Sequence, residues 1–99
     1  MPELHLESFS SRVGERFELH ENGAVLPLRL HEVTPGAARE QGGPGARSRQ
    51  FAVEFLGPSE PLLPQRIYRI EHPELGGFEL FLVPLGRSTE GTRYEAVFT

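Results

Sequence analysis

The feature that most constrains this chain is a series of six short runs with the residue patterns of β-strands, in most of which apolar and polar residues alternate. Alternation is typical of a β-strand with one buried face, because successive side chains point to opposite sides of a sheet. The six runs are 16–21, 25–33, 49–57, 66–72, 78–85 and 92–99. A helical period is almost absent elsewhere in the chain. We therefore expect an all-β fold.

The connections between these runs contain the residues that turns require. Asn22 and Gly23 stand between two alternating runs, and both residue types readily adopt the positive φ angles of a two-residue hairpin. Residues 73–77 and 86–91 are also short and contain glycine. Six short antiparallel strands in a single small domain, residues 1–99, predict a meander. Such a meander hides its apolar face by closing as a barrel or by folding as a two-layer sandwich.

Three segments depart from simple alternation. Ser8 can cap a short helix at about residues 8–13, whose apolar residues Phe9 and Val13 would close one end of the sheet. Residues 34–48 contain glycine, proline and no apolar side chain larger than alanine, which predicts a flexible loop. Residues 78–85 are apolar at consecutive positions, which predicts a strand covered on both faces. No internal repeat is visible.

Composition removes several kinds of chemistry. Cysteine, lysine and aspartate are all absent, and the net charge is −4 at pH 7. Without cysteine there is no thiolate zinc site or cysteine nucleophile, and without lysine there is no Schiff base. The arginines are scattered among the glutamates, which argues against a nucleic-acid partner. No signal peptide or membrane span is visible, so we expect a cytoplasmic protein that does not bind membranes.

The stretch His72-Pro73-Glu74 matches half of a zinc-deaminase signature, but the cysteine-containing half is missing. A small metal-dependent enzyme that uses His20, His31 or His72 with glutamates is the alternative to a non-catalytic domain. None of these histidines stand at ligand spacing along a strand. We therefore predict no catalytic residue, cofactor or metal site. We interpret His72 as the surface end of a hairpin, where alanine would hardly change stability.

A small β-domain can bind another protein through an unpaired strand edge. The candidate edges are residues 25–30, where Pro27 cannot donate to a ladder, and residues 93–98. The candidate contact residues are Leu26, Leu28, Leu30, Arg93, Glu95 and Val97. Another alternative is a barrel that holds a small apolar ligand, which a filled interior would exclude. The side chains expected to fill the interior are Phe51, Phe55, Tyr68, Leu80 and Phe98.

Several short motifs occur together in the second half of the chain. They are Tyr68 and Ile70, "HPELG" at 72–76, "ELFLVPLGR" at 79–87 and "YEAVF" at 94–98. With these motifs the chain resembles a small uncharacterised family of bacterial all-β domains. The resemblance implies no assigned activity and carries over no catalytic residue. It implies genes beside proteins similar to phage-tail collar or fibre proteins. We accordingly expect a non-enzymatic structural or assembly accessory that binds a fibre- or collar-type protein or a second copy of itself.

Overall fold

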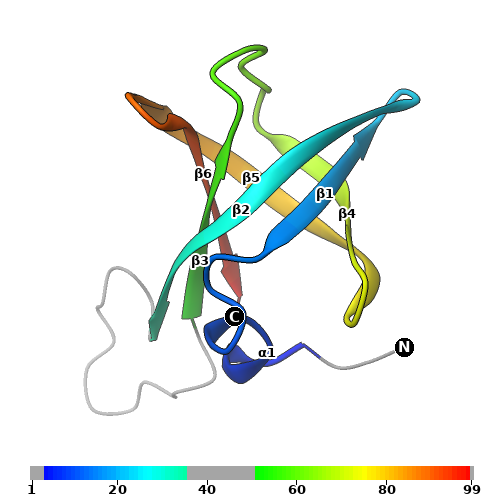
Figure 1. Cartoon of the computed structure of the whole chain (residues 1–99), viewed down its shortest axis with the longest axis vertical. Coiled ribbons are helices and arrows are strands. Elements are labelled where there is room, and N and C mark those ends of the chain that lie inside the picture. The colour runs from blue at the N-terminus through cyan, green and yellow to red at the C-terminus, as the bar shows by residue number, and fades with distance from the viewer. Residues whose placement is uncertain (1–3, 36–50, 99) are drawn as a thin grey trace.

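A computed structural model describes residues 4–35 and 51–98. They form six antiparallel strands that close into a barrel, with one short helix at one end (Figure 1). The elements are α1 (Leu6–Ser10), β1 (Arg16–Glu21), β2 (Ala24–Pro35), β3 (Phe51–Gly57), β4 (Arg66–His72), β5 (Gly76–Ser88) and β6 (Gly91–Phe98). The predicted small all-β barrel with an amino-terminal helix is confirmed, and the sandwich alternative is wrong.

The strands follow one another around the ring in the order β1-β2-β3-β6-β5-β4. The expected meander is corrected at one place, because residues 58–65 carry the chain from β3 across the end of the barrel to β4 (Figure 1). As a result β3 pairs with β6, and β4 closes the ring against β1. The two halves of the chain, β1–β3 and β4–β6, therefore have the same internal pairing, although the sequence shows no repeat.

Glycines in two turns and at an irregularity inside β5 show why particular residues are needed. Asn22 and Gly23 turn β1 into β2 with φ angles of 50° and 83°, as predicted. Gly91 begins β6 with φ of 137°, and a Cβ added there would overlap the carbonyl oxygen of Gly57. Gly86 has nearly the same φ, 138°, but an added Cβ would meet no atom within 4 Å. Gly91 is thus required by a close backbone approach, and Gly86 by backbone conformation alone.

One apolar core fills the barrel, because every strand turns its alternate residues inward. The buried cluster consists of Phe9, Phe17, Leu19, Leu28, Leu30, Phe51, Val53, Phe55, Leu63, Tyr68, Ile70, Leu75, Phe78, Leu80, Leu82, Tyr94 and Ala96. Phe98 packs against this cluster. The five side chains predicted to fill the interior therefore do so. This occupies the space that a small apolar ligand would need.

The helix α1 closes one end of the barrel with Phe9. Its ring is fully buried and lies against four other phenylalanine rings at centroid distances from 5.3 to 6.2 Å. The helix starts at Leu6, two residues before the predicted range of 8–13. Ser8 therefore lies in its first turn instead of capping it, and its hydroxyl accepts the N–H of His5. Val13, expected to join Phe9 in the plug, lies beyond the helix and is half exposed.

Two other expectations concern connections and membranes. Of the predicted flexible loop at 34–48, Thr34 and Pro35 belong to β2, and the rest lies outside the described residues. Across 4–35 and 51–98, no helix has the length and the apolar character needed to cross a membrane.

Candidate functional site

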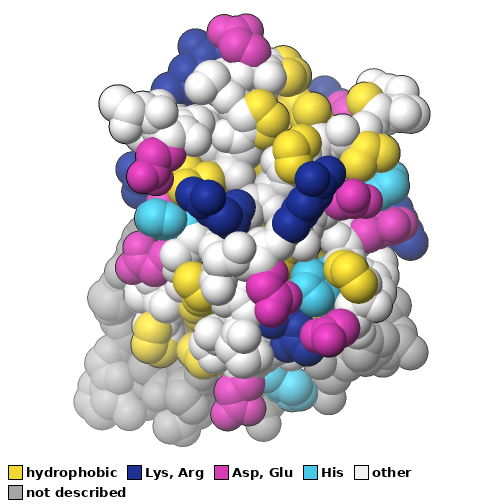
Figure 2. Space-filling model, viewed as in Figure 1, with side chains coloured by type: hydrophobic (Ala, Val, Ile, Leu, Met, Phe, Trp, Pro, Cys, Tyr) yellow, Lys and Arg dark blue, Asp and Glu magenta, His cyan; other side chains and the backbone are white. Residues whose placement is uncertain are grey.

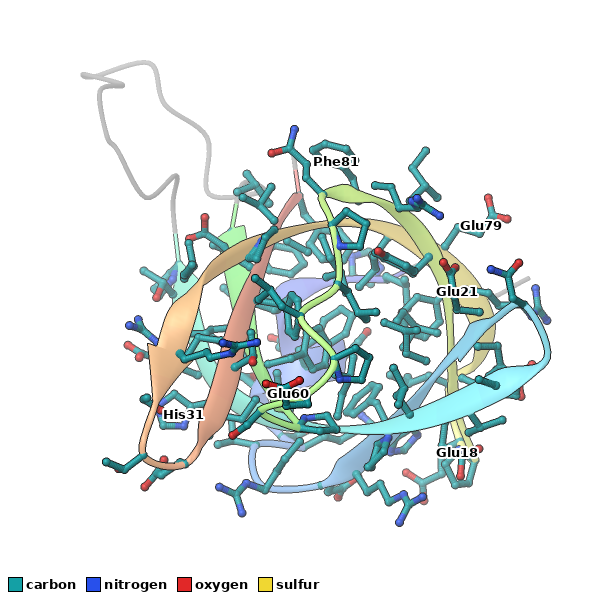
Figure 3. The ribbon with its side chains drawn as sticks, turned by 90° about the horizontal axis from the view of Figure 1, so that it is seen from above. Glu18, Glu21, His31, Glu60, Glu79 and Phe81 are labelled. Atoms are coloured by element: carbon teal, nitrogen blue, oxygen red, sulfur yellow. The ribbon has the colours of Figure 1, made fainter. Side chains whose placement is uncertain are left out.

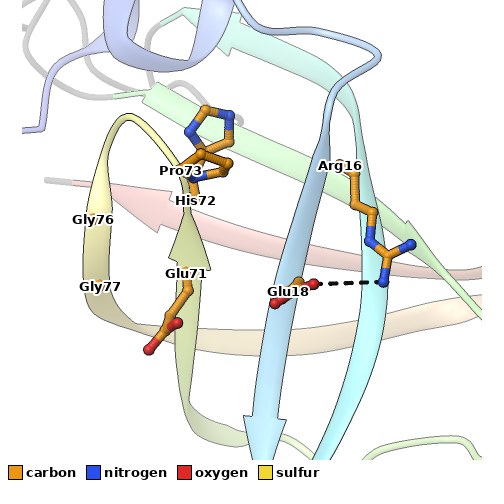
Figure 4. Close-up of a pocket in the computed structure, with 7 residues that line it drawn as sticks. All are labelled: Arg16, Glu18, Glu71, His72, Pro73, Gly76 and Gly77. Atoms are coloured by element: carbon orange, nitrogen blue, oxygen red, sulfur yellow. Dashed lines mark ion pairs between the residues drawn. The ribbon is translucent and has the colours of Figure 1, made fainter.

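A groove of about 460 Å³ opens between β1 and the hairpin of β4 and β5 (Figure 4). It lies where β1 and β4 stop pairing, since their register covers only the positions from Glu18 to His20. The residues that line it are Arg16, Glu18, Glu71, His72, Pro73, Gly76 and Gly77. Most of the "HPELG" motif therefore borders the place where the barrel closes.

His72 is the most deeply buried polar side chain of this groove, with 6% of its surface exposed. Its Nδ1 accepts the backbone N–H groups of Glu74 and Leu75 at 3.0 and 3.3 Å. This places the ring proton on Nε2, which donates to Oε1 of Glu15 at 2.8 Å. The ring also packs on Phe17, with centroids 4.5 Å apart. The hairpin position predicted for His72 is correct, but its placement at the surface is wrong.

This arrangement gives His72 a structural role. A general base needs an available lone pair, and a metal ligand needs one directed at the ion. Both ring nitrogens of His72 are already used within the protein, one by the turn and one by Glu15. The side chain therefore holds the turn between β4 and β5 against the start of β1.

The charged side chains around the groove form ion pairs with one another. Arg16 lies 3.5 Å from Glu18, as the dashed line in Figure 4 marks, and Arg69 Nε lies 3.1 Å from Oε2 of Glu71. Nε2 of His20 lies 3.4 Å from Oε1 of Glu71 and 3.8 Å from Oε1 of Glu18, makes no hydrogen bond with either, and forms an ion pair with them only when the ring is protonated. At least a third of each of these side chains is exposed. Such pairs contribute little to stability individually.

The histidines of the metal alternative are not brought together. His20 lies beside Glu18 where β1 pairs with β4, His72 is buried at the hairpin of β4 and β5, and His31 is exposed on β2. Figure 3 shows His31 and Glu18 on different sides of the barrel. In the part of the chain that the structure describes, no group of three or more histidine and acidic side chains could hold a metal ion. The sequence alternative of a His/Glu metal site therefore lacks a ligand set in these residues.

The two predicted strand edges belong to strands that are paired on both sides over part of their length, because the barrel is closed. β2 pairs with both β1 and β3, and β6 pairs with both β3 and β5. Leu28 and Leu30 point into the core, and Leu26 packs against it. The edge expectation is wrong for residues 29–30 and 93–95, which are paired on both sides, whereas residues 25–28 pair only with β1 and residues 96–98 only with β3. Arg93, Glu95 and Val97 do face outward, so their part in protein binding stays a prediction.

The outer wall of the barrel carries a second candidate surface, on β5. Ile67 of β4 lies directly opposite Phe81, and 60% and 49% of their surfaces are exposed. Val83 and Leu85 continue the outward face of β5, with Leu85 42% exposed. We call these four residues the β5 row. The prediction that 78–85 is covered on both faces is wrong for the described residues, because only the face with Phe78, Leu80 and Leu82 is covered.

The face viewed in Figure 2 has a different character. Arginine, glutamate and histidine side chains are interspersed there, with neither sign of charge gathered into one region. Sequence reasoning chose residues 25–30 and 93–98 for binding and missed Ile67 and Phe81. The signal that could have found them was the run of consecutive apolar residues at 80–83, since one half of such a run must face outward from a closed barrel.

A family model described as a domain of unknown function (DUF6916) matches residues 4–98. The chain belongs to the DUF6916 family. The match covers the helix and all six strands, so the DUF6916 domain here is the barrel itself. None of the curated proteins and none of the solved structures compared with the chain matches it.

Membership of DUF6916 confirms the resemblance to a small uncharacterised domain family. The bacterial origin of the DUF6916 domain and its gene neighbourhood beside phage-tail proteins stay predictions. Of the two surfaces described, the groove has its polar groups engaged internally, whereas the β5 row is uncovered.

Proposed function

We propose that this barrel is a non-enzymatic structural or assembly accessory that binds another protein through the β5 row, in a phage-tail-like or fibre system. The observation that carries the proposal is the exposed cross-strand pair of Ile67 and Phe81. Single exposed apolar residues are ordinary on protein surfaces. A continuous row of large ones is typical of an interaction site.

The rest of the chain offers little that could cover this row. In the segments outside the described residues, 1–3, 36–50 and 99, Met1 is the only apolar side chain larger than alanine or proline. The described residues leave the row open, with Ile67 and Phe81 both exposed. Residues 1–99 therefore hold no evident segment to cover the row, and the proposal takes a partner protein as the source of the covering apolar surface.

Two observations support a binding role over catalysis. Both nitrogens of His72, the histidine of the sequence motif, serve the hairpin turn and Glu15. The charged side chains of the groove form surface ion pairs with one another. The fibre or collar context comes from the resemblance described above, which implies such proteins as gene neighbours.

The proposal is tested by co-expressing the full chain with the fibre- or collar-type protein encoded beside it. We expect a complex on size-exclusion chromatography. Phe81→Ser and Ile67→Ser should each weaken it roughly tenfold or more, as central apolar contacts of an interface do. Val25→Ser is the matched control, because Val25 is a strand residue with 46% of its surface exposed elsewhere on the barrel.

Circular dichroism and thermal unfolding show whether each variant keeps the parent fold. The proposal is wrong if no complex forms, or if folded Phe81→Ser binds the partner as tightly as Val25→Ser does.

A further inference from the structure

Two carboxylates flank the β5 row. Glu79 precedes Phe81 by two residues on the outward face of β5, and Glu95 of β6 lies directly opposite Val83. Figure 3 shows the side chains of Glu79 and Phe81 both directed away from the barrel interior. Among residues 4–35 and 51–98, neither carboxylate has a hydrogen-bond or ion-pair partner. The row is therefore bordered on both sides by carboxylates that form no direct hydrogen bond or ion pair within these residues.

The arginines nearest to these carboxylates are held elsewhere. Arg69 lies directly opposite Glu79, but its Nε bonds Glu71 at 3.1 Å. Arg93 bonds Glu54 through two nitrogens at 2.6 and 3.2 Å. The hydrogen bond from Arg93 to Glu54 raises the pKa of the guanidinium above its usual value and keeps it fully charged. Neither arginine forms a direct ion pair with Glu79 or Glu95, although the charge of Glu95 also acts on Arg93.

A second copy of the chain fits this surface poorly. Two copies packed on the β5 row would each bring an unpaired Glu79 and Glu95 to the same interface. Like charges placed together at an interface are unfavourable, and each copy also carries a net charge of −4. A partner with positive charge at both borders of an apolar centre would remove this penalty.

We infer that the segment which binds the β5 row is apolar at its centre and carries arginine or lysine on both sides of that centre. This inference rests on the proposed function and adds the chemistry of the partner. The apolar centre covers Ile67 and Phe81, while the basic residues reach Glu79 and Glu95. The apolar contact provides most of the affinity, and the charges select the partner and speed its association.

The test uses the full chain and two synthetic peptides as probes. Both peptides have the same centre of alternating valine, threonine and phenylalanine, and they differ only in having arginine or glutamate at both ends. We expect the arginine peptide to shift the backbone amide signals of residues 66–69, 79–85 and 93–97 in nuclear magnetic resonance spectra. The glutamate peptide should bind at least roughly tenfold more weakly, since its ends repel both carboxylates.

Two variants of the chain then test whether Glu79 and Glu95 are the carboxylates that the basic ends of the peptide contact. Glu79→Gln and Glu95→Gln should each weaken the arginine peptide roughly two- to fivefold, as expected for exposed ion pairs. This difference should shrink at about 1 M salt, where charges are screened within a few ångströms. Glu90→Gln is the control, because Glu90 is an exposed carboxylate in the turn before β6, away from the row. It should leave the affinity unchanged.

Several results would overturn the inference. These are equal binding of the two peptides, binding of neither peptide, and no effect of either glutamate variant. Sedimentation that shows a dimer dissociated by Phe81→Ser would also overturn it, because the occupant would then be a second copy. Equal binding of both peptides at the row leaves the proposed function standing. By contrast, the proposed function is wrong if a fibre-type partner binds the Phe81→Ser variant as tightly as it binds the parent chain.

Discussion

Nε2 of His72 donates to Oε1 of Glu15 at 2.8 Å across the place where the barrel closes. The same ring accepts two backbone N–H groups of the turn that follows it. One side chain therefore ties the residue before β1 to the hairpin of β4 and β5. The histidine that looked like half of a catalytic signature is a structural tie.

This tie reverses the expectation that His72 can be replaced at no cost. We expect His72→Ala to lower the free energy of unfolding by about 1–3 kcal/mol, because the N–H groups of Glu74 and Leu75 lose their acceptor. Urea unfolding at neutral pH measures the change. His31→Ala is the control, since His31 is exposed on β2 and should stay within about 0.5 kcal/mol of the parent. Similar midpoints for the two variants would contradict the structural role.

Gly91 and Gly86 both have positive φ angles, but only Gly91 also lies too close to another backbone segment for a side chain to fit. Their φ angles are 137° and 138°, but only at Gly91 would a Cβ overlap a backbone carbonyl, that of Gly57. Gly86→Ala should cost about 1–3 kcal/mol, from backbone strain alone. Gly91→Ala should cost clearly more, and its failure to give soluble folded protein would agree with this. Thermal unfolding of both variants gives the comparison, and equal melting temperatures would show that the close approach to Gly57 is unimportant.

Phe9 and Val13 test the plug at the end of the barrel. Phe9→Ala should lower the free energy of unfolding by about 3–5 kcal/mol, because it removes a fully buried ring from a cluster of phenylalanines. Val13→Ala should change it by less than about 0.5 kcal/mol, since half of that side chain is already exposed. Denaturant unfolding followed by far-ultraviolet circular dichroism measures both. If Val13→Ala lowered the free energy of unfolding as much as Phe9→Ala, the prediction that both residues close the end of the barrel would be right after all.

Tyr68 predicts how stability depends on alkaline pH. Burial raises the pKa of its phenol above the usual value, although the charge of Arg66 partly opposes this shift. The unfolded chain therefore loses this proton first as pH rises through about 10. Between the two pKa values the folded state binds more protons, so the contribution of Tyr68 to the free energy of unfolding should be constant below about pH 9 and fall above about pH 10.

Urea unfolding at a series of alkaline pH values measures this slope. The absence of lysine and cysteine simplifies the measurement, because few other side chains titrate in that range. Tyr68→Phe should show a shallower slope. The free energy of unfolding of Tyr68→Phe should also be lower than that of the parent at neutral pH, because the variant loses the hydrogen bond that the hydroxyl donates to the carbonyl of Pro64 at 2.6 Å. An identical slope in parent and variant would show that Tyr68 does not titrate as described.

The local features of the fold were predictable because they depend on neighbouring residues. Alternation located five of the strands and a run of consecutive apolar residues located the sixth, and the bounds of 16–21 and 66–72 agree with β1 and β4. The Asn22-Gly23 turn follows from backbone conformation alone. Strand order was not predictable in this way. The alternation of β3 and β4 is the same whether the two pair with each other or with β6 and β1, so periodicity cannot tell where residues 58–65 lead.

The candidate surfaces were less predictable for a related reason. His72 is polar and sits at a turn, so its sequence context resembles that of a surface residue. Its burial depends on Glu15 and Phe17, which are distant in sequence. Phe81 shows the opposite error, because an apolar residue in an apolar run was expected to be covered. A ring of six strands has only one interior, and Phe81 lies on the other side of its strand.

The equivalence of the two halves has a consequence for how the chain can assemble. Each half is a three-stranded unit with its own hairpin and a long, irregular middle strand, β2 or β5. Strand pairing joins the halves where β3 pairs with β6 and β1 with β4, and side chains such as His72 and Glu15 also meet across them. Two chains could therefore exchange halves and keep every strand pair, which is the condition for domain swapping. The segment 58–65, which crosses the barrel end, is then the hinge that decides whether the ring closes within one molecule or between two.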